Sequence, residues 1–290
     1  MITIAGGTGR VGRNVTSALT EARAQVRVLT RDPDAAHDKL GTTAGVELVA
    51  VDFDDPRTLV AAFAGAGSAF LSLGTSARQV RDEIALIDAA VAAGVGFLVN
   101  LSVGGAQREI ANDVLDWHSE IDAHLEAQEV DWTLVRPATY ADAVVDIAAN
   151  LLPAGGWGGH AGRGRASLID TRDVAAVAAT ALLEGPADHA GRAYDITGPE
   201  PVTMHDVADL LARALTRTVR YADRTRDQQR AVLESLGLPA LRVEVLLGLD
   251  DLFRGGVYAQ PTSTVEDVTG HAPRPVDEYV GEHLAAFAAA

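Results

Sequence analysis

The apolar residues between positions 2 and 196 alternate between two spacings. Short continuous apolar runs, typical of buried strands, are followed by stretches in which apolar residues recur every three or four positions, as on one face of a helix. The runs predict strands at residues 2–5, 25–30, 46–51, 69–73, 97–101, 132–136 and 193–196. The periodic stretches predict helices at residues 11–22, 35–40, 56–63, 80–91, 113–128 and 170–183. Because strands that alternate with helices build a parallel sheet between helical layers, we predict an α/β protein with a doubly wound parallel sheet.

The rhythm changes after residue 140. Residues 155–164 hold six glycines around Trp157 and His160, a segment that predicts either a lid over a site or a surface hairpin. From residue 199 onward the pattern is mostly helical. We therefore predict a doubly wound domain at residues 1–140 plus 166–198, and a smaller, mostly helical subdomain at residues 141–165 plus 199–290.

Two capping boxes mark helix starts in the last third of the chain. Thr203 with Asp206, and Ser263 with Glu266, have the spacing at which a hydroxyl and a carboxylate each bond the other residue's backbone N–H. The second of these helices is predicted to end at Gly270.

The first predicted strand runs into the turn Gly-Gly-Thr-Gly-Arg-Val-Gly at residues 6–12, which opens an amphipathic helix. Glycine lets the chain turn sharply and lets backbone N–H groups approach a pyrophosphate, which then lies at the positive end of the helix. The same glycines would also suit a tight turn that binds nothing. We favour a dinucleotide site on a Rossmann sheet, with contacts from Gly6, Thr8, Gly9, Arg10, Val11 and Gly12.

The end of the second predicted strand indicates which dinucleotide is bound. An acid at this place would bond the adenosine ribose, but the chain has Thr30 and Arg31 there, with Asp32 one place later. Arg31, helped by Arg10, can pair with a 2′-phosphate, although a solvated surface arginine would give the same sequence. The sequence therefore favours NADP over NAD.

Further cofactor contacts are predicted after the next strands. Asp52 can accept a hydrogen bond from the adenine amino group while Phe53 covers the ring, or Phe53 can simply pack in the core. The remaining predicted contacts lie at or just after the ends of the fourth, fifth and sixth strands: Leu73, Gly74, Leu101, Ser102, Pro137 and Thr139.

Composition and charge exclude several classes of protein. The chain has 290 residues, a net charge of -16 and no cysteine, so disulfides, thiolate metal sites and thiol nucleophiles are excluded. The acidic charge argues against nucleic-acid binding. We find no apolar run of the roughly 18 to 20 residues that span a bilayer and no signal-peptide pattern. We expect a cytoplasmic protein that binds no membrane and, lacking paired histidines at ligand spacing beside a carboxylate, no metal.

Several motifs together carry a family resemblance. They are the turn at 6–12, Arg31, Asp52-Phe53, Asn100-Leu101-Ser102, the run Trp-Thr-Leu-Val-Arg-Pro at 132–137 and the run Ile-Asp-Thr-Arg-Asp-Val-Ala at 169–175. In these the chain resembles the NmrA-like atypical short-chain dehydrogenases over nearly its whole length. The resemblance implies an extended fold in which the C-terminal subdomain closes a substrate cleft over the nicotinamide.

The chain departs from the short-chain dehydrogenases at the catalytic pair. Classical members protonate the carbonyl with a Tyr four residues before a Lys, but Lys39 is the only lysine and Ala35 stands four residues before it. When the sequences are anchored on the later motifs, the two places fall on Leu115 and Ser119. The catalytic Ser of the family corresponds to Ser102, or to its neighbour Val103.

The proton for the reduction must therefore come from elsewhere. His118 lies on the same predicted helix face as Asp122 and is a candidate general acid, although a buried histidine in that place can also be structural. Tyr140 can reach the nicotinamide or the substrate, or can only pack in the cleft. Alternatively, a phenol beside the substrate ketone stabilises the alkoxide and solvent completes the protonation. The catalytic candidates are Ser102, His118 and Tyr140.

These observations predict an NADPH-dependent reductase of a ketone or quinone carbonyl on an aromatic polycyclic small molecule. The missing Tyr and Lys resemble the atypical angucyclinone ketoreductases of antibiotic polyketide pathways. A general quinone reductase would show the same motifs. A non-catalytic NADP-binding redox sensor, which regulates a protein partner, would also tolerate the loss of the catalytic pair. The sequence leaves the oligomeric state open.

Overall fold

The computed structural model describes residues 1–41, 45–107, 110–151 and 157–284. Its strands are β1 (Ile2–Ala5), β2 (Val26–Thr30), β3 (Val46–Ala50), β4 (Ser68–Leu71), β5 (Phe97–Leu101), β6 (Asp131–Pro137), β7 (Gly158–Gly159), β8 (Arg192–Ile196) and β9 (Ala222–Asp223). Its helices are α1 (Arg10–Glu21), α2 (Pro33–Leu40), α3 (Pro56–Phe63), α4 (Gln79–Ala92), α5 (Asp113–Glu126), α6 (Ala141–Leu151), α7 (Thr171–Glu184), α8 (Pro186–His189), α9 (Met204–Leu215), α10 (Arg226–Ser235), α11 (Ala240–Arg254), α12 (Thr264–Thr269) and α13 (Val276–Glu282).

Seven strands form a parallel sheet in the order β3-β2-β1-β4-β5-β6-β8. Ile4 at the centre of β1 lies beside Val28 of β2 and Phe70 of β4. The order reverses at β1, so the loops after β1 and β4 meet at the switch point where doubly wound sheets bind ligands. The predicted doubly wound sheet is confirmed.

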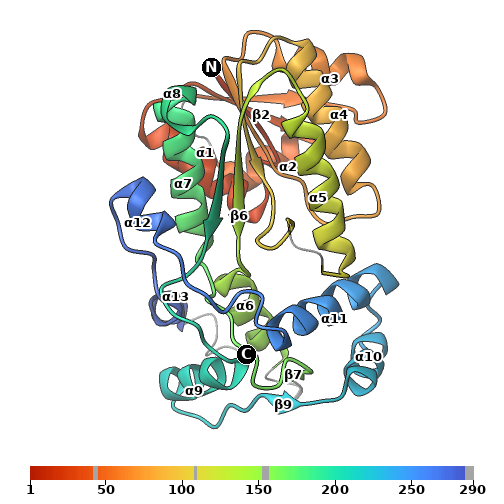
Figure 1. The fold of residues 1–290 in the computed structure, drawn as a ribbon, viewed down its shortest axis with the longest axis vertical. Coiled ribbons are helices and arrows are strands. Elements are labelled where there is room, and N and C mark those ends of the chain that lie inside the picture. Colours follow the sequence, from red (N-terminus) through yellow and green to blue (C-terminus); the bar gives the residue numbers. More distant parts are fainter. Residues whose placement is uncertain (42–44, 108–109, 152–156, 285–290) are drawn as a thin grey trace. The chain divides into compact units, whose positions relative to one another are not determined.

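Helices cover both faces of this sheet (Figure 1). Helices α1 and α7 pack together on one face, and α3, α4 and α5 cover the other. Side chains such as Leu59, Ile87 and Ile121 from the second set of helices form one apolar cluster with Leu71 and Leu98 of the sheet. Because the central strands are buried on both faces, their sequences are continuously apolar, which is the pattern that predicted them.

The chain divides into two compact units. The first comprises Met1–Glu109, Val114–Arg136 and Thr171–Tyr194, and the second comprises Ile110–Asp113, Pro137–Asp170 and Asp195–Ala290. The first unit contains most of the seven-stranded sheet, and the second contains α6 and helices α9 to α13. The predicted domains, divided at residues 140, 166 and 198, differ from these units in placing residues 110–113, 137–140, 166–170 and 195–198 with the sheet, and they stay a prediction.

The described part of the glycine-rich segment is buried in the second unit. Trp157 and His160 are almost fully buried, and β7 pairs in parallel with β9. The His160 ring lies between two carboxylates, 3.1 Å from Asp250 and 2.8 Å from Asp251. Because the strand pairing is parallel and distant in sequence, residues 157–164 are not a surface hairpin; residues 155 and 156 lie outside the described residues.

One of the two predicted capping boxes is present. The Thr203 hydroxyl accepts from the Asp206 backbone N–H at 3.1 Å and the Asp206 carboxylate accepts from the Thr203 N–H at 2.8 Å. The box at Ser263 is wrong, because the Ser263 side chain accepts no hydrogen bond from the helix N–H groups, and its hydroxyl donates to the Asp267 carboxylate at 2.6 Å. The helix still ends at Gly270, in a left-handed conformation. No helix in the described ranges has both the length and the apolar content to cross a membrane.

Candidate functional site

The glycine turn between β1 and α1 leaves no space for a side chain at Gly6 or at Gly12. Gly6 has φ of +81°, and a methyl group there would overlap the carbonyl oxygen of Ser72. A methyl group at Gly12 would overlap the carbonyl oxygen of Gly6. Both glycines are therefore required by the backbone, one for its conformation and one for close packing.

The N-terminus of α1 fits an anion. Gly9 is its N-cap and has no side chain to accept from the first N–H groups, and the first turn carries no acidic residue. The next two helices differ, because Asp32 caps α2 and Asp55 caps α3. Since an uncapped helix end presents N–H donors and positive potential, this end at the switch point suits a pyrophosphate. The predicted contacts Gly6, Thr8, Gly9, Arg10, Val11 and Gly12 all lie in this turn or the first turn of α1.

The residues after β2 favour a phosphate over a bare ribose. Arg31 follows β2 directly and is exposed. The Asp32 carboxylate, which follows Arg31 directly, accepts from the Ala35 N–H at 3.0 Å and caps α2. Asp32 is therefore held by its own helix, which leaves the arginine as the side chain at the strand end.

The segments after β3 and β4 hold four more predicted contacts. The Asp52 carboxylate accepts from the Asp54 N–H at 2.9 Å and remains exposed. Phe53 and Leu73 are half-buried and pack against the apolar cluster of the sheet, so the core-packing role of Phe53 is present. A side chain at Gly74 would meet open space, so this glycine is not required by packing.

A buried polar cluster lies between β5, β6, α4 and α5, all in the first unit. Its members are Gln79 and Glu83 of α4, Asn100 and Ser102 at the end of β5, His118 and Asp122 of α5, and Arg136 of β6. The pairs on each helix are four residues apart, so they share one helix face. Asn100 and Ser102 are two residues apart and share one face of the sheet with Leu98.

Two chains of hydrogen bonds connect the cluster. The Gln79 Nε2 lies 3.1 Å from Glu83 Oε1 and 3.1 Å from His118 Nε2. Because an amide nitrogen donates, His118 Nε2 accepts and its proton is on Nδ1. In the second chain, Ser102 and Arg136 both donate to Asp122.

Burial shifts the pKa values of three groups here. It raises the pKa of Glu83 to about 8, partly offset by hydrogen bonds from Gln79 and the Leu73 backbone. It lowers the pKa of His118 to about 4. It raises the pKa of Asp122 to about 6, against the lowering effect of Ser102 and Arg136. At neutral pH, Glu83 and His118 are therefore neutral and Asp122 is ionised.

Burying this cluster costs folding free energy, because several of its polar atoms lack hydrogen-bond partners. Side-chain atoms of five residues have no hydrogen-bond partner within the described part of the chain: Gln79 Oε1, Glu83 Oε2, both amide atoms of Asn100, His118 Nδ1 and Asp122 Oδ1. Each such atom costs about 1–3 kcal/mol relative to water. Unsatisfied groups and shifted pKa values concentrate at functional sites, so this cluster beside the switch point is the candidate catalytic region.

Glu83 should make stability depend on pH in a defined window. Its folded pKa, about 8, exceeds the usual 4.5, so the folded protein holds a proton that the unfolded chain releases. The free energy of unfolding therefore falls as pH rises from about 4.5 to 8, by up to about 1.4 kcal/mol per pH unit. The slope belongs to Glu83 alone only between about pH 7.5 and 8, where neither Asp122 in the folded protein nor His118 in the unfolded chain still titrates appreciably. We expect Glu83→Gln to remove this slope in urea unfolding, and the exposed Glu120→Gln to retain it. Parallel curves for wild type and Glu83→Gln would contradict the assignment.

The predicted proton donors lie in different units. His118 is 8% exposed and neutral, so it can donate from Nδ1 but carries no imidazolium proton at neutral pH. Tyr140 belongs to the second unit, where it bridges to Ile169 in parallel fashion and is half-buried. At the places of the family's Tyr and Lys, Leu115 is buried and Ser119 is exposed on α5. Neither of these supplies acid chemistry.

The remaining predicted cofactor contacts are also divided. Leu101 is the last residue of β5 and Ser102 follows it, both in the first unit. Pro137 and Thr139 belong to the second unit, where the Thr139 carbonyl accepts from the Ile169 N–H at 3.0 Å. Pro137 is buried and Thr139 half-buried.

The sequence analysis did not predict Gln79, Glu83, Asn100 or Arg136 as site residues, and it did not predict that Ser102 bonds Asp122. A signal was present, because Glu83 stands on the apolar stripe of its helix and Asn100 interrupts an apolar strand. Only the packing of α4 and α5 shows that these positions meet.

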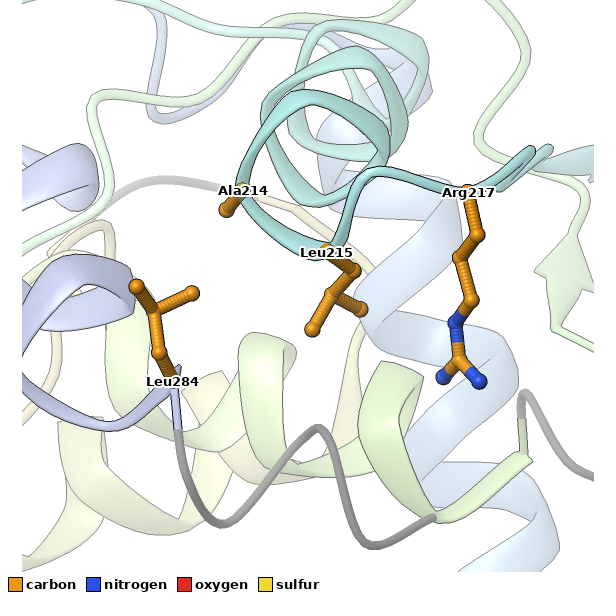
Figure 2. A pocket seen from close by; sticks show the side chains of 4 residues that line it. All are labelled: Ala214, Leu215, Arg217 and Leu284. Atoms are coloured by element: carbon orange, nitrogen blue, oxygen red, sulfur yellow. The ribbon is translucent and has the colours of Figure 1, made fainter.

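A small surface pocket on the second unit is not part of the candidate site. It is lined by Ala214, Leu215, Arg217 and Leu284 (Figure 2). Three of these side chains are aliphatic and none belongs to the predicted site. Within the described ranges, no group of three or more His, Asp or Glu side chains is arranged to hold a metal ion.

The turn after β1, on a sheet of this order, puts the chain in the Rossmann class of α/β proteins. Within that class it belongs to the NmrA-like family, whose sequence profile matches residues 1–279. The resemblance seen in the motifs is thereby confirmed.

Three relatives span essentially the whole chain. The NAD(P)H azoreductase of Xenophilus azovorans is 33% identical over 290 residues, with 100% of each chain covered. The (4-alkanoyl-5-oxo-2,5-dihydrofuran-3-yl)methyl phosphate reductase of Streptomyces griseus is 34% identical over 289 residues, with 99% of each chain covered. The NADPH-dependent quinone oxidoreductase of Escherichia coli, solved with NADPH, has a TM-score of 0.89 and 27% identity, covering 97% of this chain and 99% of that one.

Proposed function

We propose that the chain is an NADPH-dependent reductase that transfers a hydride to a conjugated small molecule, with quinones as the principal class of acceptor. It is an oxidoreductase with NADP(H) as cofactor. The observation that carries the proposal is the uncapped N-terminus of α1 behind a turn that requires Gly6 and Gly12, in a member of the NmrA-like family.

The choice of NADPH is supported by the end of β2. Arg31 is exposed there, and Asp32 is held as the cap of α2. An arginine can bind a 2′-phosphate with two parallel hydrogen bonds, and the acid that follows Arg31 is engaged in capping α2.

The names of the relatives support a conjugated acceptor. They describe an azoreductase, a dihydrofuranone reductase and a quinone oxidoreductase. An azo group, an unsaturated lactone and a quinone each spread the charge left by an added hydride over a π system. Such acceptors need little help from a protein acid, which agrees with a chain that has neither the Tyr nor the Lys of the classical pair.

In this proposal the residues of the chain mainly bind the cofactor and the acceptor and orient them toward each other. The turn at 6–12 and the first turn of α1 hold the pyrophosphate, and Arg31 holds the 2′-phosphate. The bound cofactor supplies the hydride. A quinone that gains one hydride becomes a hydroquinone monoanion, and one proton from water completes the hydroquinone. The narrower proposal is a ketone on a polycyclic aromatic antibiotic polyketide, where a neighbouring phenol stabilises the alkoxide by an internal hydrogen bond.

A panel of acceptors tests the function. The protein is incubated anaerobically with NADPH and a naphthoquinone, an azo dye, or an anthraquinone-type ketone with an adjacent phenol, while NADPH absorbance is followed and products are identified by mass spectrometry. We expect turnover with the quinone. The contrary result has two parts: NADPH binds but no acceptor is reduced, and a protein partner binds only in the presence of NADP. That result would reject the reductase and support the function of a redox sensor.

The proton step makes a separate prediction. If water protonates the reduced quinone, kcat of His118→Ala and of Tyr140→Phe should stay within about tenfold of wild type. A general acid contributes about 10²- to 10⁴-fold, so a larger loss in one variant would identify it as the donor. Thermal unfolding of both variants shows whether a loss of kcat comes from a loss of folding. The variant Ser119→Ala, at an exposed position of the same helix as His118, is the control.

A further inference from the structure

Ser102 is fixed in place just beyond β5. It is 3% exposed, and its backbone N–H donates to the Val135 carbonyl of β6 at 2.8 Å. It therefore lies at the carboxyl ends of two adjacent parallel strands, the edge of the sheet where such folds bind ligands.

The hydroxyl proton of Ser102 is already used. Ser102 Oγ donates to Asp122 Oδ2 at 2.8 Å. Asp122 Oδ2 also accepts two hydrogen bonds from Arg136, from Nε at 3.1 Å and from Nη2 at 2.9 Å. Arginine stays cationic, so the carboxylate beside it accepts only. Three donors thus converge on one oxygen of a carboxylate that is 4% exposed.

A serine whose single proton is donated can only accept from other groups. The oxygen of a ketone or quinone is itself only an acceptor, so Ser102 in this state cannot bond it. The nicotinamide end of NADPH carries the opposite chemistry, because its carboxamide NH₂ and its ribose hydroxyls donate.

We propose that Asp122 and Arg136 are positioning residues that hold Ser102 as a hydrogen-bond acceptor, so that Ser102 binds a donor group of the nicotinamide half of the cofactor rather than the oxygen of the acceptor. This inference rests on the proposed function for the identity of the cofactor. It assigns Ser102 to cofactor binding and removes it from the sources of the proton.

A double-mutant cycle tests the proposal with NADP⁺ binding measured by calorimetry. Ser102→Ala should raise Kd about tenfold, the size of one lost hydrogen bond, and Ser102→Thr should restore it. Asp122→Asn puts an amide there, whose oxygen accepts more weakly than a carboxylate and whose NH₂ can donate to Ser102 Oγ. It should therefore also weaken binding, but it should add nothing in the Ser102→Ala background. Glu126→Gln is the control, since Glu126 lies one helical turn beyond Asp122 and 3.9 Å from Arg136. A merely structural role of Asp122 would make its effect independent of Ser102 and would overturn the proposal.

Titration gives the same test without changing Asp122. Its charged and titratable surroundings are Arg136 on β6, Glu126 and His118 on α5, and Glu83 on α4. Because burial raises the pKa of Asp122 to about 6, the wild-type Kd should rise more steeply below pH 6 than that of Ser102→Ala. The 2′-phosphate titrates in both proteins and cancels in the comparison. Parallel curves would overturn the proposal even if Asp122→Asn did not fold.

Activity separates this inference from the proposed function. With a naphthoquinone, Ser102→Ala should change kcat less than threefold while KM for NADPH rises. A kcat loss of a hundredfold with unchanged NADP⁺ affinity would make Ser102 a donor to the acceptor and would overturn the inference alone. A wild type that binds NADP⁺ but reduces nothing would reject the reductase and leave the binding result standing, whereas a wild type that does not bind NADP⁺ would reject both.

Discussion

Gly12→Ala is expected to abolish detectable NADPH binding, with Kd raised at least about a hundredfold. The added methyl group would overlap the Gly6 carbonyl and lie 2.9 Å from the Gly7 Cα. The turn must then open, which moves the N–H groups at the start of α1 away from the pyrophosphate. Two lost hydrogen bonds to a charged group are worth about 3–6 kcal/mol, which corresponds to at least two orders of magnitude in Kd. Calorimetric titration with NADPH measures this directly.

A matched variant controls for a general effect of the methyl group. Gly67 has open space around it and does not have positive φ, so Gly67→Ala should bind NADPH as the wild type does. Far-UV circular dichroism shows whether the sheet persists in Gly12→Ala. If Gly12→Ala fails to fold, Gly9→Ala is the second variant in which NADPH binding is measured. Its methyl group would contact only the Gly6 carbonyl oxygen, at 3.1 Å, so it disturbs the turn less. Wild-type affinity in a folded Gly12→Ala would mean that the turn does not bind the cofactor.

Arg31→Asp is expected to weaken NADPH binding about thirtyfold or more and to leave NADH binding within about threefold. Arg31 is exposed at the end of β2, and its neighbour Asp32 is an acceptor-only anion that cannot bind a phosphate in its place. One charged hydrogen bond contributes about 1.5–3 kcal/mol, and the new carboxylate adds repulsion toward the 2′-phosphate. Dissociation constants for NADPH and NADH, measured with both proteins, give the change in preference.

Lys39→Asp is the control for overall charge. It produces the same change of two charges on an exposed side chain of α2, without a proposed contact to the cofactor. We expect its preference for NADPH to equal that of the wild type. If Arg31→Asp and Lys39→Asp behaved alike, the discrimination would come from long-range electrostatics and not from Arg31.

The fold was largely predictable because its signals are local. The strand β5 and the helix α3 have the predicted bounds, since an apolar run and a helical period are properties of neighbouring residues. The Ser263 box failed although its sequence spacing is right, because the Ser263 side chain accepts no hydrogen bond from the first turn of α12. Several elements of the structure were not predicted individually: the helices α6, α8, α10, α11 and α13 and the short strands β7 and β9. Among them, α10 has a capping box at Thr225 and Gln228.

The site was predictable only where it follows the chain. The glycine turn and Arg31 lie in single continuous segments at strand ends, so their chemistry can be read in order. The buried cluster gathers Glu83, Asn100 and Asp122 from three segments. No local pattern states that these side chains meet, and their pKa values are set by burial that the sequence does not contain.

By itself the sequence determined the sheet, the glycine turn between β1 and α1, the family and the absence of a Tyr-Lys pair. Each of these depends on residues that are adjacent or regularly spaced along the chain. Only the tertiary structure decided that Asp32 is held by α2, that His118 is neutral, and that the Ser102 proton is donated to Asp122. Those properties depend on which groups exclude water from one another, and that is fixed only when distant segments pack together.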